Sequence, residues 1–217
     1  KAKLMPFKPD QNGIPNPLDV ERLVTKKTKA IVLISPNNPT GAIYPPDIIT
    51  SFYEFAREKE IALIIDETYK DFLGSIQPHS LFQKKQWEET FIQIYSFSKV
   101  FSLTGYRVGS IIAGEKTIQS ITKIMDTLAI CAPRISQDAA LFGLANLSNW
   151  VSEKQQIIKK RCDFVQELFQ SKDINFELVS CGAYFAYIKH PFVDLSARQA
   201  AIKLAKQANI LCLPGTF

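Results

Sequence analysis

Short apolar runs alternate with a helix-like segment in the first half of this 217-residue chain. Ala30–Ile34 is continuously apolar, and apolar residues at helical spacing follow Pro45. A second apolar run covers residues 61–65, and a third covers residues 91–95. Uninterrupted apolar runs of this length are typical of parallel strands that are buried on both faces. The order of strand, helix and strand therefore predicts an α/β fold with a mostly parallel sheet flanked by helices.

The second half of the sequence predicts helices first and a small mixed unit after them. The predicted elements are a strand at 108–113, helices at 115–129, 134–147 and 149–170, strands at 176–179 and 184–188, a helix at 196–207 and a strand at 210–213. The helix at 149–170 is long enough to connect two compact units. We therefore expect a large domain at residues 1–160 and part of a smaller α+β domain at residues 161–217.

The composition excludes several classes of function. The chain is 46% hydrophobic and 22% charged, which is ordinary for a globular protein, and no apolar run reaches the roughly 20 residues of a membrane span. Its net charge of +5 comes from scattered basic residues, which does not favour nucleic-acid binding. The four cysteines lack CxxC spacing, so we expect reduced, buried thiols in a cytoplasmic protein. His79 and His190 are isolated in the sequence, so no metal site is predicted.

The segment directly after the run at 91–95 carries the most specific chemistry. It places Ser96, Ser98 and Lys99 close together, and Arg107 follows eight residues after the lysine. Hydroxyl groups and a planar guanidinium suit a phosphate group. A lysine held between buried strands can condense with an aldehyde. Pyridoxal phosphate (PLP) carries both groups, so this segment predicts a PLP site.

Two other segments follow apolar runs in the same way. Ser35-Pro36-Asn37-Asn38-Pro39-Thr40-Gly41 comes after the first run, and Asp66-Glu67-Thr68-Tyr69 comes after the second. In open α/β sheets, ligands bind beyond the carboxyl ends of the strands. One crevice can therefore collect Asn38, Asp66 and Lys99. A carboxylate such as Asp66 suits the pyridine nitrogen of PLP, because it keeps that nitrogen protonated.

These three segments together resemble the motifs of the class I/II aminotransferases, a family of fold-type I PLP-dependent enzymes. The resemblance extends from about Pro6 to Phe217. It implies the large domain of a PLP-dependent transferase, followed by part of the small domain. It also implies a cytoplasmic homodimer. Because family members are longer at both ends, we expect the chain to be a piece of a larger enzyme that lacks the N-terminal part of the large domain.

The resemblance also implies roles for individual residues. Lys99 forms a Schiff base with PLP and then moves the proton between the substrate α-carbon and C4′ of the cofactor. Asp66 faces the pyridine nitrogen, while Tyr69 and Asn38 bind the phenolic oxygen. In a plain structural interpretation, Lys99 is a surface lysine, Asp66 caps a turn and Tyr69 is a packing residue.

The phosphate group is assigned by resemblance to Ser96, Ser98 and Arg107. The two serines have the i, i+2 spacing of a strand, so we expect both to face one side. Alternatively, Ser98 packs beside the lysine and Arg107 forms a structural ion pair. Arg134 and Tyr44 are weaker candidates for a substrate contact, and Arg134 is also consistent with an ordinary surface residue.

The function that the resemblance implies is transfer of an amino group from an amino acid to a 2-oxo acid. One alternative is a PLP-dependent C–S β-lyase, and another is the aminotransferase-like sensing domain of a transcription regulator. The family's arginine for the substrate carboxylate and its N-terminal phosphate turn lie outside these residues. The sequence therefore leaves open which amino acid and which 2-oxo acid are used.

Overall fold

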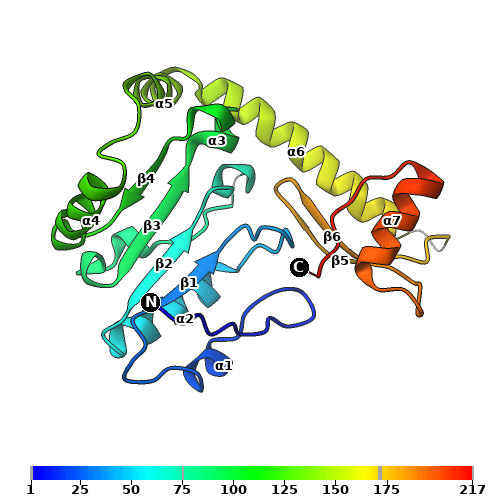
Figure 1. Cartoon of the computed structure of the whole chain (residues 1–217), viewed down its shortest axis with the longest axis horizontal. Coiled ribbons are helices and arrows are strands. Elements are labelled where there is room, and N and C mark those ends of the chain that lie inside the picture. Colours follow the sequence, from blue (N-terminus) through cyan, green and yellow to red (C-terminus); the bar gives the residue numbers. More distant parts are fainter. Residues whose placement is uncertain (1, 75, 171–172, 217) are drawn as a thin grey trace.

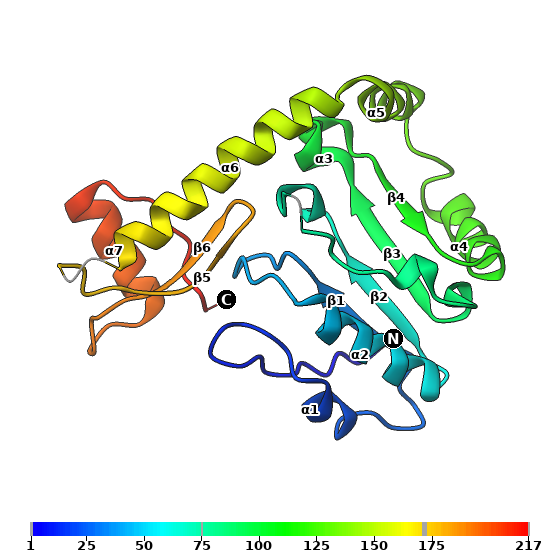
Figure 2. The same cartoon turned by 180° about the vertical axis from the view of Figure 1, so that it is seen from behind.

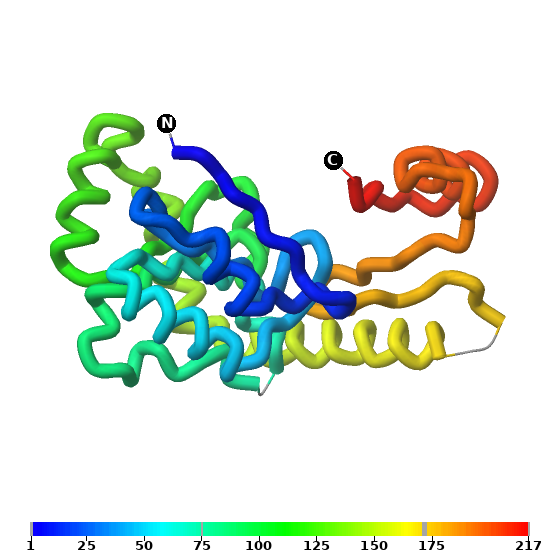
Figure 3. Tube along the Cα trace, turned by 90° about the horizontal axis from the view of Figure 1, so that it is seen from below, coloured from blue at the N-terminus to red at the C-terminus, as the bar shows by residue number. Residues whose placement is uncertain are grey.

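The structure is a computed structural model that describes residues 2–74, 76–170 and 173–216. A main sheet with helices around it occupies one end of the molecule, and a hairpin with one helix occupies the other (Figure 1). Figure 3 shows the same separation from below, with α4 and the C-terminal residues at opposite ends. The α/β class predicted from the sequence is confirmed.

Four strands form the main sheet in the order β1-β2-β3-β4. The strands β1 (Ala30–Ile34), β2 (Ala62–Asp66) and β3 (Phe91–Ser96) are parallel, and β4 (Gly109–Ile112) runs antiparallel to β3. Each strand begins and ends within one residue of its predicted bounds. The sheet is therefore mostly parallel, as its continuous apolar runs predict.

One face of the sheet is covered by α2 (Pro46–Glu58), which begins with a proline in its first turn. Ile49, Phe52 and Ala56 recur at helical spacing on this helix and are fully buried. They form one core cluster with Leu63 of β2. Burying a side chain such as Phe52 stabilises the fold by about 1.5–3 kcal/mol.

The opposite face, which we call the open face, carries apolar side chains with little cover. Val32, Ile94 and Ile111 on this face are 52%, 37% and 40% exposed. Strand pairing places Asp66 beside Ile94, and paired residues of neighbouring strands point to the same side of a sheet. Asp66 therefore lies on the open face. Ser96, two residues after Ile94, lies there too.

Three helices follow β4 and lead away from the sheet: α4 (Glu115–Leu128), α5 (Arg134–Asn146) and α6 (Ser148–Phe169). Each lies within one residue of its predicted bounds. Figures 1 and 2 show α6 running from α5 to α7. Since α6 passes residue 160 without a break, a domain boundary there stays a prediction. Within the described ranges, no helix combines the length and apolar character of a membrane span.

The second unit contains the hairpin β5 (Glu177–Gly182) and β6 (Phe185–Lys189), followed by α7 (Ala197–Ala208). Ser196 begins α7 with a capping box, in which its side chain and that of Gln199 bind each other's backbone N–H groups. The predicted strand at 210–213 is wrong. These residues have no regular secondary structure and pair with no strand of the described chain, and Leu211 is 91% exposed.

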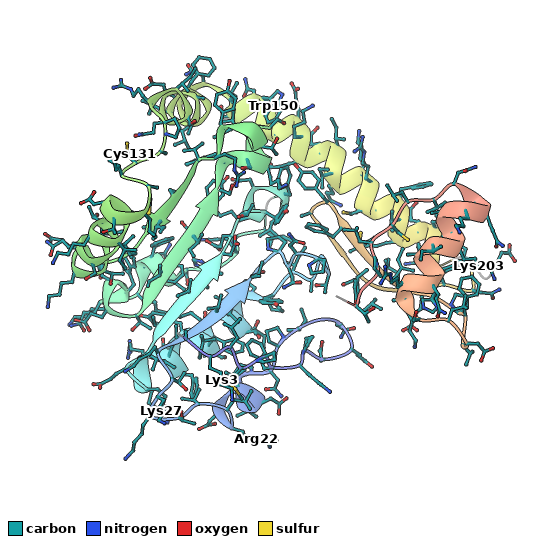
Figure 4. All side chains as sticks on the ribbon, in the orientation of Figure 1. Lys3, Arg22, Lys27, Cys131, Trp150 and Lys203 are labelled. Atoms are coloured by element: carbon teal, nitrogen blue, oxygen red, sulfur yellow. The ribbon has the colours of Figure 1, made fainter. Side chains whose placement is uncertain are left out.

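Basic side chains are spread over the molecule. In Figure 4, Lys27 and Lys203 lie at opposite ends. Lys159 pairs with Asp163 one helical turn away, at 2.6 Å between Nζ and Oδ2, and both side chains are largely exposed. This distribution agrees with solvated faces rather than with one basic patch.

The four cysteines are free, but the prediction that all are buried is wrong. Cys131 and Cys212 are exposed, and Figure 4 shows Cys131 on the connection between α4 and α5. Cys162 on α6 and Cys181 on β5 are half-buried, and the Cys162 thiol donates to the Ala183 carbonyl at 3.6 Å. The two half-buried cysteines lie on elements that are distant in sequence, so the residues around each cysteine did not distinguish half-buried from exposed thiols.

We expect the thiols to react at different rates. Burial, and then the neighbouring Cys162 thiol, raise the pKa of Cys181 to about 12. Since the thiolate is the reacting form, Cys181 should be alkylated by iodoacetamide at pH 8 more slowly than Cys131. Mass spectrometry of peptides over a time course measures both rates, with unfolded protein as the control. Equal rates in the folded protein would contradict the buried environment of Cys181.

Candidate active site

The carboxyl ends of β1, β2 and β3 meet at one edge of the sheet, which we call the carboxyl edge. Asn38 lies four residues after β1, while Asp66 and Ser96 are the last residues of β2 and β3. In Figure 1 this edge faces the β5–β6 hairpin. The fold therefore brings the three predicted segments to one side of the molecule, as expected for ligand sites in parallel sheets.

Asp66 makes two hydrogen bonds through a single carboxylate oxygen. Its Oδ1 accepts from the Thr68 backbone N–H at 3.0 Å and from the Thr68 hydroxyl at 2.6 Å. Asp66 thus caps the turn that follows β2, as one of the sequence interpretations expected. Among the described residues, none donates to the other oxygen, Oδ2. That oxygen is left on the open face for a further partner.

Tyr69 is buried beside Asp66. Burial, and then the negative charge of Asp66, raise the pKa of the Tyr69 phenol above its usual value. The ring packs edge-on against Tyr184 and Phe185, with centroid distances of 5.9 and 5.1 Å. The phenol therefore stays protonated near neutral pH and can act as a hydrogen-bond donor.

The loop after β1 is held by Asn37 rather than by Asn38. Asn37 Oδ1 accepts from the Thr40 hydroxyl at 2.8 Å, and its amide donates to the Tyr44 hydroxyl at 3.3 Å. Tyr44 is buried beneath this loop. Asn38 is exposed, so its side-chain amide remains accessible to a ligand at the carboxyl edge.

The expected strand spacing of Ser96 and Ser98 is wrong. The chain turns into the short helix α3 (Phe97–Val100) directly after Ser96, so only Ser96 belongs to the strand. Ser96 caps this helix, and its hydroxyl accepts from the Ser98 backbone N–H at 3.3 Å. Ser98 is buried within α3. The two serines are adjacent through this cap and not through a shared face of β3.

Lys99 is half-buried in α3, and Arg107 is exposed just before β4. A hydrogen bond from Phe97 N to Val108 O, 3.3 Å long, holds these two segments together. Arg107 forms no ion pair within the described part of the chain, so the alternative prediction of a structural ion pair is wrong. Its guanidinium donates instead to the Thr104 carbonyl at 3.0 Å.

Arg134 lies away from this group at the start of α5. Its Nε is 2.8 Å from Asp138 one turn further along the same helix, and both side chains are exposed. This contact is typical of an i, i+4 surface pair. The structure therefore gives Arg134 a partner on its own helix.

The β5–β6 hairpin supplies contacts that the sequence analysis missed. The Ser180 hydroxyl donates to the Thr40 carbonyl at 2.6 Å, across 140 residues of sequence. The turn of the hairpin also brings Tyr184 and Phe185 against Tyr69. No local pattern signals these contacts, because they depend on where α6 places the hairpin.

The hairpin approaches the loop after β1 so closely that Gly41 has no room for a side chain. Gly41 has φ +74°, and a Cβ there would lie 2.8 Å from Gly182 N and from Phe185 O. We expect Gly41→Ala to destabilise the protein by about 2–3 kcal/mol through strain and collision. The melting temperature should fall by roughly 5–10 °C.

Gly74→Ala is the matched control for this prediction. Gly74 also has a positive φ, +67°, but a Cβ added there would meet no atom within 4 Å, so only backbone strain remains. We expect a loss of about 1 kcal/mol there. Equal melting temperatures for the two variants would contradict the close approach of the hairpin.

A buried polar group lies on the covered side of the sheet, behind Asp66. Glu67 is 1% exposed; its Oε1 is 3.1 Å from His79 Nε2, and its Oε2 accepts from the Gln93 amide. His79 Nδ1 accepts from the Leu81 N–H at 3.2 Å, so the ring proton of a neutral imidazole is on Nε2, facing Glu67. His79, isolated in the sequence, thus lies buried against Glu67 directly after β2.

A second buried contact fixes the turn after Tyr69. The hydroxyl of Tyr95 donates to Asp71 Oδ2. Burial and this hydrogen bond raise the pKa of Tyr95 far above its usual value. Because Tyr95 directly precedes Ser96, this hydrogen bond connects the segment after β2 to the carboxyl end of β3.

The chain is similar to known proteins over nearly its whole length. The family model "Aminotransferase class I and II" matches residues 1–217. The aspartate aminotransferase of Sulfurisphaera tokodaii is 32% identical over 205 residues, which cover 91% of this chain and 50% of that protein. The (5-formylfuran-3-yl)methyl phosphate transaminase of Methanocaldococcus jannaschii is 33% identical, over 90% of this chain and 51% of that protein.

Solved structures agree with these matches. A tetra mutant of Thermus thermophilus aspartate aminotransferase superposes with a TM-score of 0.86 and 26% identity, covering 96% of this chain and 57% of that one. The chain spans about half the length of the curated relatives that it matches. Since the family model covers every residue of the sequence, the chain belongs to the class I and II aminotransferase family.

Proposed function

We propose that this protein is a PLP-dependent aminotransferase that moves an amino group from an amino acid to a 2-oxo acid. The observation that carries the proposal is the carboxyl edge, where a carboxylate with an available oxygen and a buried phenol lie at the end of β2 and a half-buried lysine follows β3. The aminotransferase names of the relatives support transfer over the lyase and sensing alternatives.

The residues at this edge fit the ring of PLP chemically. Oδ2 of Asp66 is available to accept from a protonated pyridine nitrogen, and the Tyr69 phenol and the Asn38 amide are donors for the phenolic oxygen. Lys99 supplies the amine that condenses with the aldehyde, and it then carries the proton at the substrate α-carbon. When bound, PLP supplies an electron sink for charge that develops on that carbon.

The phosphate group is proposed to bind Ser96, Ser98 and Arg107. The Phe97–Val108 hydrogen bond brings the segments of these residues together, which supports this assignment. Arg107 is exposed and already donates to a neutral carbonyl, so its remaining N–H groups stay available to an anion. Ser98 contributes less directly, because it is buried in α3.

The proposal includes a homodimer in the cytoplasm, with a large domain up to residue 160 and part of a small domain after it. Exposed apolar residues on α5, among them Leu141, Phe142 and Leu144, support an interface with another chain. The relatives are named for aspartate, for aromatic amino acids and for a furan phosphate, so the substrates named differ among them.

Chemical trapping tests the proposal. The purified protein is saturated with PLP, reduced with borohydride and digested, and the peptides are mapped by mass spectrometry. We expect the cofactor on Lys99, and we expect turnover with an amino acid to require a 2-oxo acid. An unlabelled Lys99 peptide would overturn the cofactor assignment. Release of ammonia and pyruvate without a 2-oxo acid would favour the lyase.

A further inference from the structure

Thr68 makes the two hydrogen bonds that fix the Asp66 carboxylate. Both go to Oδ1, from the hydroxyl at 2.6 Å and from the backbone N–H at 3.0 Å. The residues paired with Asp66 on the neighbouring strands are Ile34 and Ile94, whose side chains have no donor. In the described part of the chain, Thr68 is thus the residue that holds the Asp66 carboxylate by hydrogen bonds.

The backbone N–H alone is sufficient to cap the turn, so the hydroxyl has a separate effect. The χ2 angle of an aspartate is broad, and a carboxylate held by one donor can rotate about it. A second donor on the same oxygen restricts this rotation. Because threonine is β-branched, its own χ1 angle is restricted, so its hydroxyl is held in place.

We propose that the Thr68 hydroxyl is a positioning group for Asp66, which engages Oδ1 so that Oδ2 is aimed at the pyridine nitrogen of the cofactor. This inference rests on the proposed function, since the nitrogen is that of bound PLP. It goes further because it assigns a different role to each carboxylate oxygen of Asp66. Oδ1 holds the turn, and Oδ2 serves the cofactor.

Two substitutions separate the hydroxyl from the shape of the side chain. Thr68→Val keeps the volume and the β-branch but removes the hydroxyl, and Thr68→Ser keeps the hydroxyl but removes the methyl group. Thr68→Ala is a second hydroxyl-free variant in case the valine does not fold. Melting temperatures identify the variants that are folded at the temperature of the assay.

The main readout is the ¹⁵N chemical shift of the ring nitrogen in protein loaded with labelled PLP. With Thr68→Val we expect this shift to move toward that of an unprotonated pyridine, kcat to fall by about tenfold and KM to change little. Thr68→Ser should restore the shift and the rate. A ¹⁵N shift unchanged in both hydroxyl-free variants would overturn the proposal, and so would a Thr68→Ser variant as impaired as Thr68→Val.

A crystal structure of each cofactor-free variant separates this proposal from the proposed function. If the wild-type protein fails to bind PLP, the proposed function is wrong, and the ¹⁵N shift, kcat and KM no longer test the role of Thr68. The orientation of Asp66 then decides the remaining claim. A rotated carboxylate in Thr68→Val, together with a wild-type orientation in Thr68→Ser, supports positioning by the hydroxyl. A wild-type orientation in both overturns it.

Discussion

Replacing Lys99 with arginine should lower kcat for transamination by about 10⁴-fold, at the upper end of what positioned proton transfer contributes. Arginine keeps the positive charge and the approximate length of the side chain. Its guanidinium is protonated at every accessible pH, so it neither attacks an aldehyde nor accepts a proton. Steady-state kinetics measures the loss, and the absorbance spectrum of the bound cofactor shows whether it is still covalently attached.

Lys85→Arg is the matched control for this variant. Lys85 is an exposed lysine away from the carboxyl edge, so the same change of chemistry should leave turnover and the cofactor spectrum unaltered. Turnover of Lys99→Arg comparable to that of the control would contradict the role of Lys99. It would also remove the main support for a covalently held cofactor.

Asp66→Asn should reduce kcat by roughly 10²–10³-fold while leaving Lys99 able to take up the cofactor. A carboxylate about 3 Å from a protonated ring nitrogen contributes roughly 5 kcal/mol at an effective dielectric constant near 20, before desolvation is subtracted. Asparagine keeps the size of the side chain and an oxygen for Thr68 but carries no charge. Rapid-reaction measurements of proton removal from the substrate α-carbon should show the loss directly.

Asp47→Asn provides the comparison for the charge effect. Asp47 is an exposed carboxylate in the first turn of α2, so its replacement removes the same charge at a distance from the site. We expect near-normal turnover from this control. Near-normal turnover of Asp66→Asn as well would contradict the pairing of Asp66 with the pyridine nitrogen.

Elements whose apolar pattern reports local burial were predicted accurately. The strand at 30–34 pairs with β2 and buries Ile31 and Leu33 in the core, so its apolar run is enough to identify it. The apolar stripe of α2 likewise packs against the sheet beneath it. The apolar run at 210–213 was wrongly predicted to be a strand. A strand also needs a partner strand, and no strand of the described chain pairs with these exposed residues.

The site was predicted less completely, because several of its contacts join residues that are distant in sequence. The motifs identified Asp66, Tyr69 and Lys99 as candidates, and the structure brings their segments to one edge of the sheet. Contacts such as Ser180 with Thr40 depend on the position of the whole hairpin. The cap at Ser96 was missed for a local reason, since α3 is only four residues long and too short for a periodic pattern.

The hydrogen bond between Thr40 and Ser180 also has a consequence for biosynthesis. Ribosomes add about 5–20 residues per second, so roughly 7 to 28 seconds separate the emergence of the loop after β1 from that of its supporting hairpin. During that interval the nascent loop and the ring of Tyr69 lack their final neighbours. The contact between the hairpin and the carboxyl edge is therefore among the last features to form, and chaperones acting on the nascent chain would encounter this edge incomplete.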